Sequence, residues 1–465
     1  FERKEWIMST KKATAPASSR GFGAQGTGIL VLTFLSILLM SNICYDSLNV
    51  TIPQFAGKFA AMLGLPQEQM GAAVGGNIAL LYMFSTVAAW ISVIGAGIWG
   101  ALCGKKTCRF AWSLSLVVAA VGCLIWSQAG SSPIYFVALA LSYIGGMGFA
   151  YIASLNVVSN WFPHKKGLAM GWVTIGFPLS AVVATPLCTA LVNFLELSGI
   201  YYLYAALCII LAIVVWVYVR DYPEEKGAFP DNNHNFDKAA ADAELKAGLE
   251  YMKTSPWKPG KLLRTGTVWK MIISLGVMEL LSLGIMTNFL PRMQQILCNG
   301  QRVYQDAEVI PMLAVAGLVA CVGSVLCGVL DTKVGPKKAI IITYIIAIIS
   351  IILNVAAGNV AADGNKPLAT GLFYASLPFL SIMLGGAANY LVSLTNTIWG
   401  RYDFPMAYRV LKPFVAIVGA LGITICGGVG NAGPGYGVAY MILGVLAVIG
   451  TIIMFTVDDT QVGRD

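Results

Sequence analysis

The sequence predicts an all-α membrane protein with twelve transmembrane helices in two six-helix bundles. The first reason is composition: 57% of the 465 residues are hydrophobic and only 11% are charged, which is far more apolar than soluble chains usually are. The second is that apolar stretches long enough to cross a hydrocarbon core of about 30 Å recur along the chain. The third is a repeat between the two halves. Because lipid offers the backbone no hydrogen-bond partners, these stretches are expected to be helices.

The spans fall into two groups of six. Apolar runs and the Gly, Pro and charged residues between them place the spans at 28–53, 71–99, 109–128, 132–159, 167–194 and 198–219, and then at 268–290, 308–330, 337–358, 367–398, 410–430 and 434–457. The first span follows a basic arm and lacks a clear small-residue cleavage site, so we expect a retained helix rather than a signal peptide. The expected divisions are an arm, a bundle, a linker, a second bundle and a tail, at 1–27, 28–219, 220–266, 267–458 and 459–465.

Basic residues decide the expected orientation in the membrane. They gather in the N-terminal arm, in the linker and in the loops after spans 2, 4, 8 and 10, and those outside the linker are Lys11, Lys12, Arg20, Lys105, Lys106, Arg109, Lys165, Lys166, Lys333, Lys337, Lys338, Arg401 and Arg409. All lie on one side, so the positive-inside rule makes both termini and the linker cytoplasmic. The opposite loops hold mainly Lys58, Arg292, Arg302 and Lys366. Because the net charge of +8 is spread over short loops beside spans, the expected partner is the lipid bilayer and not a nucleic acid.

The two halves of the chain repeat each other at a separation of about 240 residues, as expected for a parallel repeat. The matching residues keep the same order: Gly145-Gly146, Asn156 and Phe162-Pro163 correspond to Gly385-Gly386, Asn396 and Phe404-Pro405, and Pro53 corresponds to Pro291. The polar linker contains an Ala/Glu/Lys-rich stretch, 237–253, that we expect to form a surface helix. Its expected role is to join two halves that move against each other.

Cysteine and histidine give no sign of a metal centre or of catalysis. Nearly all ten Cys lie inside apolar segments, where a thiol is usually a packing residue. Cys103 and Cys108 are the exception, but no second Cys pair or His accompanies them, so no metal or other cofactor is expected. Both His, His164 and His234, fall in predicted cytoplasmic loops. Without an intramembrane His, an HExxH motif or a Ser/His/Asp arrangement, a membrane-embedded enzyme is disfavoured.

The loop after span 2 carries a glycine-rich motif. Residues 97–106 read GIWGALCGKK, which resembles the signature of the major facilitator superfamily: a Gly-rich helix end, a tight turn and a basic pair. Ala101 stands where that family usually has an acidic residue, and the counterpart in the second half, 328–338, keeps an acidic residue one place early. The resemblance implies a cytoplasmic gate formed by Gly97, Gly104, Lys105, Lys106, Asp331, Gly335 and Lys337.

A more specific string follows span 4. Residues 160–171 read NWFPHKKGLAMG, which resembles the loop of bacterial organic-anion members of the superfamily, including the oxalate:formate antiporter group and the monocarboxylate carriers. The residues also have a direct physical interpretation. A helix ends before Pro163, a basic pair lies at the membrane surface, and Gly167 and Gly171 begin a close-packed helix.

The resemblance implies a monomeric secondary transporter of the bacterial cytoplasmic membrane, which moves a small organic acid by alternating access. Symport with protons is the favoured mode. The alternatives are exchange of organic anions and transport of an amphipathic acid such as a bile acid. A small dicarboxylate exchanger is expected to show basic side chains deep in spans 8 and 11, and span 8 has none. A sensor that does not transport is a further alternative, but it would usually carry a signalling domain, and none is recognised.

Two carboxyl groups lie inside predicted spans. Glu279 falls near the middle of span 7 and Asp46 in the outer half of span 1, and neither has an obvious basic partner in the sequence. A buried ionisable group is costly and therefore suggests function. We expect Glu279 to couple proton movement to transport, with Asp46 as the second candidate. Lys412, about a turn into span 11, is expected to snorkel to the cytoplasmic surface.

Polar side chains form stripes on the spans that line the central cavity in the superfamily, namely 1, 4, 7 and 10. Their spacing of three and four residues predicts one helical face in span 1. The candidate substrate residues are Asn42, Tyr45, Asp46 and Asn49 in span 1, Asn156 in span 4, Glu279 and Ser282 in span 7, and Asn389, Tyr390, Ser393 and Asn396 in span 10. The alternative is that these side chains only hold helices together.

Overall fold

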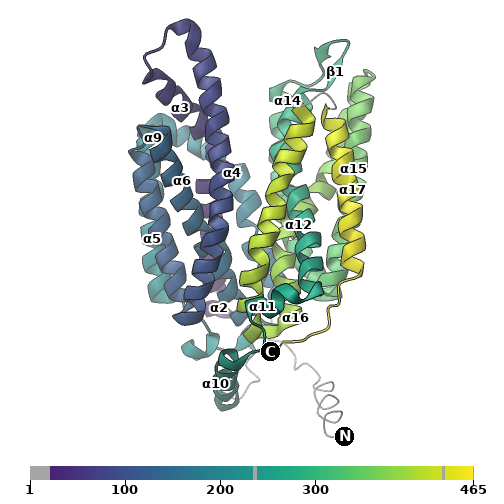
Figure 1. The fold of residues 1–465 in the computed structure, drawn as a ribbon. Helices are drawn as coiled ribbons and strands as arrows, with labels where there is room; N and C mark the ends of the chain where they lie inside the picture. The colour runs from purple at the N-terminus through teal and green to yellow at the C-terminus, as the bar shows by residue number, and fades with distance from the viewer. Residues whose placement is uncertain (1–20, 234–237, 432–434, 464–465) are drawn as a thin grey trace.

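The computed structural model describes residues 21–233, 238–431 and 435–463. Within them the chain is almost entirely helical, apart from a short antiparallel pair of strands, β1 (Leu297–Cys298) and β2 (Gln301–Arg302). The helices form two upright bundles that stand side by side, one from each half of the chain (Figure 1). The predicted fold class, an all-α membrane protein of two six-helix bundles, is confirmed.

The N-terminal bundle holds spans 1 to 6. Its elements are α2 (Gly23–Ser41), η2 (Asn42–Asp46) and α3 (Leu48–Ala61) in span 1, α4 (Gln67–Lys105), α5 (Cys108–Ser127), then α6 (Ser132–Gly146), η3 (Met147–Ile152) and α7 (Ala153–Trp161) in span 4, and finally α8 (Lys166–Val173) and α9 (Gly176–Tyr218). The long helix α9 changes direction at Glu196, where φ is 58°. Its first part completes span 5 and its second part is span 6.

The C-terminal bundle holds spans 7 to 12. Its elements are α12 (Gly266–Thr287), α13 (Phe289–Gln294), α14 (Asp306–Val334), α15 (Pro336–Ala362), α16 (Lys366–Asn431) and α17 (Gly435–Phe455). The helix α16 changes direction at Gly400, where φ is 68°, a value that favours glycine. It therefore contains both span 10 and span 11.

Ten segments of the described residues are long and apolar enough to cross a membrane by themselves. Span 5, which α8 and the first part of α9 form, is not among them. Spans 10 and 11 count once because they share α16. Twelve crossings follow, as the sequence predicts. Two helices run well past their predicted ends: α3 continues to Ala61 instead of ending near residue 53, and α4 continues to Lys105 instead of ending near residue 99.

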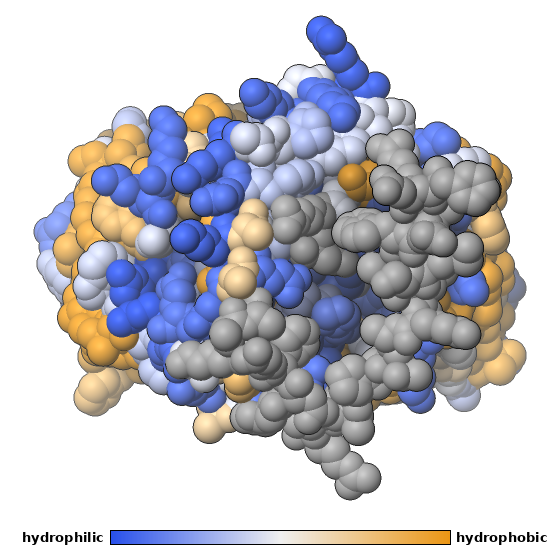
Figure 2. Space-filling view, turned by 90° about the horizontal axis from the view of Figure 1, so that it is seen from below, coloured by the Kyte–Doolittle hydropathy of each residue, from blue (hydrophilic) through white to orange (hydrophobic). Residues whose placement is uncertain are grey.

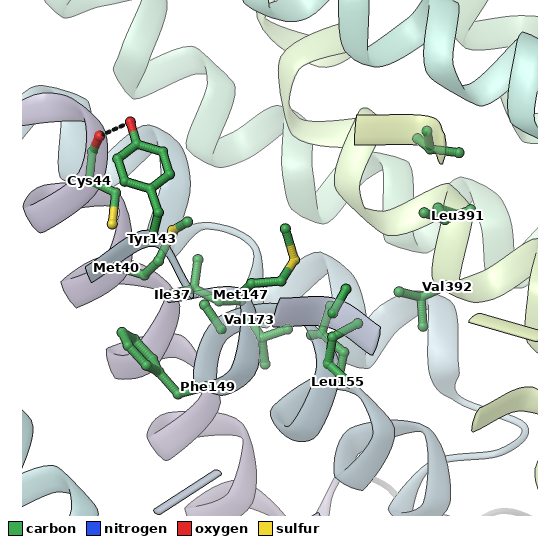
Figure 3. Close-up of a cluster of buried hydrophobic side chains, with 14 of the residues drawn as sticks. Ile37, Met40, Cys44, Tyr143, Met147, Phe149, Leu155, Val173, Leu391 and Val392 are labelled. Carbon is green, nitrogen blue, oxygen red and sulfur yellow. Dashed lines mark hydrogen bonds between the residues drawn. The ribbon is translucent and has the colours of Figure 1, made fainter. Parts of the chain in front are cut away.

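Spans 1 and 4 each contain a π-helical segment, η2 and η3, whereas spans 7 and 10 are assigned as α-helix. A π-helix fits more residues into a turn, so it changes which side chains share a face. Both segments lie in the main hydrophobic core, where each packs against the other span: η3 contributes Met147 and Phe149 beside α2 of span 1, and the Tyr143 hydroxyl of α6 donates to the carbonyl of Cys44 in η2 (Figure 3).

The two ends of the molecule differ. At the end that carries the linker and the C-terminal tail, here named the linker end, the bundles lie against each other, and at the opposite far end they stand apart (Figure 1). Glycines allow the close approach of α8 and α14. A Cβ at Gly171 would lie 2.8 Å from the carbonyl oxygen of Ser324, and Gly328 faces Gly167 in the same way. The structure therefore shows a state closed at the linker end.

The linker covers part of this closed end with short helices, which are η4 (Pro223–Lys226), η5 (Pro230–Asn232), α10 (Lys238–Thr254) and α11 (Pro259–Arg264). The helix α10 occupies the described part of the stretch in which we expected a surface helix. Seen from this end, hydrophilic side chains gather across the middle and hydrophobic ones show at the margins (Figure 2). This distribution fits a chain whose flanks contact lipid.

Candidate functional site

Glu279 and Lys412 form an ion pair in the interior of the C-terminal bundle. The Nζ atom of Lys412 lies 3.1 Å from both carboxylate oxygens of Glu279. The Lys412 side chain is 6% exposed and that of Glu279 is 22% exposed. The expectation that Glu279 lacks a basic partner, and that Lys412 only snorkels to the surface, is wrong. The carboxylate is charge-compensated, yet it keeps some access to solvent.

Glycine residues allow the helices that carry Glu279 and Lys412 to approach each other closely. A Cβ at Gly419 would lie 2.7 Å from Cγ of Glu279, and one at Gly276 would lie 2.6 Å from Cβ of Val418. At Gly422 a Cβ would collide with the backbone of Leu280. Span 11 thus approaches span 7 at glycines, as is usual where membrane helices pack closely. The contact brings Lys412 within reach of a carboxylate 133 residues earlier in the chain.

Tyr151 connects this ion pair to the other bundle. It lies in η3, and the Nζ atom of Lys412 is 4.6 Å from the centroid of its ring. The same ring stacks on Phe177 of span 5 at a centroid distance of 5.5 Å. An ammonium group over an aromatic face is attracted by the ring electrons. The cation is therefore shared between Glu279 of one half and Tyr151 of the other. Sequence reasoning missed Tyr151, although it lies in a span expected to line the cavity.

Asp46 has a different environment in the N-terminal bundle. Its carboxylate accepts hydrogen bonds from Ser41, at 2.9 Å, and from Ser180 of span 5. Among the described residues no Lys or Arg pairs with it. The carboxyl group is therefore held by hydroxyl donors alone.

The polar side chains of the π-helical segment in span 1 contact different neighbouring helices. Asn42 accepts a hydrogen bond from the Tyr204 hydroxyl of span 6 at 2.6 Å, whereas the Tyr45 ring lies against Tyr143 of span 4 and is 39% exposed. The three described polar side chains of this segment thus contact three different helices. The side chain of Asn49 lies outside the described residues.

The polar residues of span 10 join the two bundles. The amide of Asn389 donates to the carbonyl of Ser324 at 3.1 Å, and its oxygen accepts from the Thr174 hydroxyl of the opposite bundle. The amide of Asn396 donates to the Ser159 hydroxyl of α7 at 2.7 Å. In this state both asparagines hold the linker end closed.

The remaining candidates have local roles. The Tyr390 hydroxyl lies 2.8 Å from that of Thr343, inside the C-terminal bundle. The amide of Asn156 donates to a carbonyl one turn back in its own span. Ser393 is buried, and Ser282, which follows Glu279 by about one turn, is partly exposed. Ser282 therefore lies on the same helix as Glu279, whereas Tyr390 bonds to another residue of the C-terminal bundle.

The second-half gating motif lies at the bundle boundary. Asp331 is buried, and a Cβ at Gly167 would lie 2.5 Å from its Oδ2 atom. Gly167 belongs to the first turn of α8, where unpaired N–H groups carry partial positive charge. Gly335, with φ of 84°, ends α14. Lys337 pairs with Asp459 of the tail at 3.7 Å.

The first-half motif is not arranged as expected. The helix α4 continues through Gly97 and Gly104 to Lys105, so the tight turn begins only at Lys106. A Cβ at Gly97 or at Gly104 would meet no atom within 4 Å, and both lysines are exposed. The contact is instead made by Gly100, where a Cβ would collide with the side chain of Arg409 from span 11.

A second buried ion pair fastens the linker. The two terminal nitrogens of Arg401, Nη1 and Nη2, donate to Glu224 at 3.0 and 3.1 Å, and the two side chains are only 8% and 3% exposed. Glu224 follows span 6, and Arg401 lies in the turn between spans 10 and 11. Asp221, three residues earlier, accepts from the backbone N–H groups of Cys108 and Arg109, and burial raises the pKa of Asp221. The sequence marked Arg401 only as a topology signal.

Comparison with known proteins places this geometry in a family. The family model of the Major Facilitator Superfamily matches residues 48–402, well over half of the chain. An uncharacterised 38 kDa protein of Thermoproteus tenax is 24% identical over 380 residues, which cover 81% of this chain and 86% of that protein. The oxalate:formate antiporter of Oxalobacter formigenes is 30% identical over 83 residues, which cover 18% of this chain and only 20% of the antiporter.

A solved structure shares the fold over nearly its full length. The proton:xylose symporter XylE superposes with a TM-score of 0.69 at 15% sequence identity, over 94% of this chain and 97% of that one. The family model and this fold together confirm the resemblance predicted from the loop motifs. The chain belongs to the major facilitator superfamily and is a multi-pass membrane transporter rather than an enzyme.

Proposed function

We propose that this transporter is a symporter that moves a small organic monoanion together with a proton. The observation that carries the proposal is the Glu279–Lys412 ion pair of the C-terminal bundle, whose ammonium group also contacts Tyr151 of the other bundle. Glu279 is the proton-carrying group in this proposal, and Lys412 is the group that binds the anion. Ser282 and Tyr45 are proposed to contact the organic part of the substrate, because both keep exposed surface.

Charge balance explains why both ligands travel together. In the empty transporter the pair is neutral, and Lys412 has no free charge to offer. A proton on a carboxylate oxygen of Glu279 frees the ammonium group, which then binds the carboxylate of the substrate. The loaded centre holds one proton and one anion and is again neutral. Movement with only one of them would bury a net charge, which is costly in a low-dielectric interior.

The number of cations favours a monoanion. Among the described residues, Lys412 is the cation that contacts Glu279. One ammonium group balances one carboxylate, whereas a dicarboxylate would leave a negative charge uncompensated. The aromatic rings of Tyr151 and Phe177 beside the pair also suit a substrate with an apolar part.

The closed linker end and the basic residues together support an orientation in the membrane and an outward-facing state. Basic residues place the linker in the cytoplasm by the positive-inside rule. We therefore infer that the structure is outward-facing, with the far end open to the outside of a bacterial cytoplasmic membrane. Alternating access would then require the contacts of Asn389, Asn396 and Asp331 to separate.

Exchange of two organic anions is the second candidate. The likeness to the oxalate:formate antiporter favours it, although it covers a small part of that protein. In an exchanger, one anion would replace another on Lys412, and the Glu279 carboxylate would not need to bind a proton.

Transport by purified protein in vesicles separates the two candidates. A gradient of one pH unit can drive about tenfold accumulation of an anion that moves with one proton. We expect the wild type to accumulate a labelled monocarboxylate such as lactate or benzoate on this gradient. Glu279→Gln should abolish the accumulation, because a fixed amide cannot cycle a proton, while exchange of internal for external substrate survives.

The matched control is Glu308→Gln. Glu308 pairs with Lys366 at 2.7 Å, but this pair is exposed at the far end. The control should accumulate substrate like the wild type. Normal accumulation by Glu279→Gln would overturn the assignment of the proton to Glu279, and wild-type exchange with no response to a pH gradient would favour the exchanger.

A further inference from the structure

We propose that Arg292, together with Tyr440 and Asn354, forms a binding site for a small monovalent anion inside the C-terminal bundle, towards its far end. The site is built on α13, α15 and α17, whereas Glu279 and Lys412 lie on α12 and α16. It is independent of the proposed substrate and of the proposed coupling to protons.

The burial of Arg292 is the first observation. The sequence marks this residue as one of the few basic residues in the loops opposite the linker, where a cation would normally meet water. In the structure it is only 3% exposed. A Cβ at Gly358 would lie 3.2 Å from its Nη2 atom, so a glycine of α15 makes room for the guanidinium group.

The second observation is the missing counter-ion. The Nη2 atom donates to the carbonyl oxygen of Asn354, and the guanidinium carbon lies 3.7 Å from the ring centroid of Tyr440. No carboxylate within the described residues forms an ion pair with Arg292. Arginine keeps its charge in proteins, and a ring face offsets only part of the cost of burying it.

The third observation is that Arg292 and the two residues that contact it carry unsatisfied polar atoms. Nε and Nη1 of Arg292, the Tyr440 hydroxyl and Oδ1 of Asn354 are buried and have no hydrogen-bond partner among the described residues. Buried polar atoms are rarely left in this way. The N–H and O–H donors outnumber the single carbonyl acceptor, which favours a ligand that accepts hydrogen bonds. Water would satisfy donors, but an anion also neutralises the charge.

Thermal unfolding of the purified transporter tests the site with the anion alone. Sodium chloride is titrated against sodium gluconate at constant ionic strength, with gluconate as the bulky comparison anion. We expect the Tm of the wild type to rise with chloride and to saturate after a gain of about 2–4 °C. A parallel titration with acetate separates the two possible sources: a response to chloride assigns an inorganic ion, and a response to acetate alone assigns a carboxylate.

Variants test whether the anion that raises the Tm binds at Arg292. Arg292→Met should abolish the dependence on the anion, while Arg302→Met, which removes an exposed arginine of β2, should leave it unchanged. Should Arg292→Met fail to fold, Tyr440→Phe removes one donor with little change in shape, and the anion concentration at half effect should rise severalfold. Bromide should give an anomalous scattering peak beside the guanidinium in crystals. A wild-type Tm that is independent of both anions, or a bromide peak elsewhere only, would overturn the site.

Discussion

The two bundles repeat one pattern, yet they hold their central carboxyl groups in different ways. Glu279 of the C-terminal half lies in regular α-helix and is paired with Lys412. Asp46 of the N-terminal half lies in a π-helical segment and is held by the hydroxyl groups of Ser41 and Ser180. One half balances its carboxylate with a full opposite charge, and the other only solvates it with neutral donors.

This difference separates two roles that a repeated fold can assign to its halves. When a charge-paired carboxylate takes up a proton, its former partner remains a cation and can bind an anionic ligand. A carboxylate held by hydroxyls offers no cation to a substrate anion. Hydroxyl groups can, however, donate to an anionic oxygen or accept from a protonated one. The C-terminal half is therefore the better candidate for anion binding.

Lys412→Met is expected to have the largest effect. It leaves Glu279 buried without its cation, so we expect uptake to be lost and the free energy of unfolding to fall by about 2–4 kcal/mol, somewhat less than for a fully buried pair. The double variant Glu279→Gln/Lys412→Met should regain most of the stability but not the transport. Chemical denaturation and vesicle uptake measure the two effects.

The exposed pair gives the control for that experiment. Lys366→Met removes the partner of Glu308 at the surface, where the change in stability should be several times smaller. If Lys412→Met were as mild as this control, or if it still transported the anion, the central pair would be no more than a structural contact.

A second experiment compares what the halves contribute to the linker end. The N-terminal half places Gly100 against Arg409, and we expect Gly100→Val to prevent full closure there. A reporter Ser159→Cys, normally covered beside Asn396, should then react with a thiol reagent about tenfold faster, because the open state is more populated. Gly97→Val is the matched control, because a Cβ at Gly97 would meet no atom within 4 Å. Equal labelling in both variants would remove Gly100 from the gate.

The smallest effect is expected at Asp46. Asp46→Asn keeps an oxygen that accepts from Ser41 and Ser180, so the stability should change by less than about 1 kcal/mol. Asp46→Leu leaves both donors without a partner and should cost about 1–3 kcal/mol. Accumulation on a pH gradient should survive in Asp46→Asn. Its loss there, together with its survival in Glu279→Gln, would reverse the roles of the two halves.

The fold was predictable because it depends on local properties. The length of apolar runs, the Gly and Pro residues at helix ends and the basic residues of the loops can be recognised without knowing which segments contact each other. They located twelve spans and the linker helix α10. The errors in the fold come from backbone details. Nothing in the residues 42–46 distinguishes a π-helical turn from an α-helical one, so the π-helical segment of span 1 was not predicted.

The site was predictable only in part, because it depends on which spans meet. Glu279 and Asp46 stood out as charges in apolar segments, but the partner of Glu279 lies 133 positions away and is brought close by Gly419. For the same reason Asn389 and Asn396, expected to line a cavity, instead bond across the closed linker end. A polar residue in a span indicates a contact without indicating which one.

The buried Glu224–Arg401 pair has a consequence for the speed of the transporter. We expect opening of the linker end to separate this pair, because Glu224 follows Asp221, which bonds to the N-terminal bundle, whereas Arg401 lies within the C-terminal bundle. Breaking a buried ion pair costs about 3–5 kcal/mol, before hydration of the separated charges offsets part of that cost. If the transition state bears that full amount, the step slows by roughly two to four powers of ten. We therefore expect turnover to be limited by release of this contact and not by binding of the substrate.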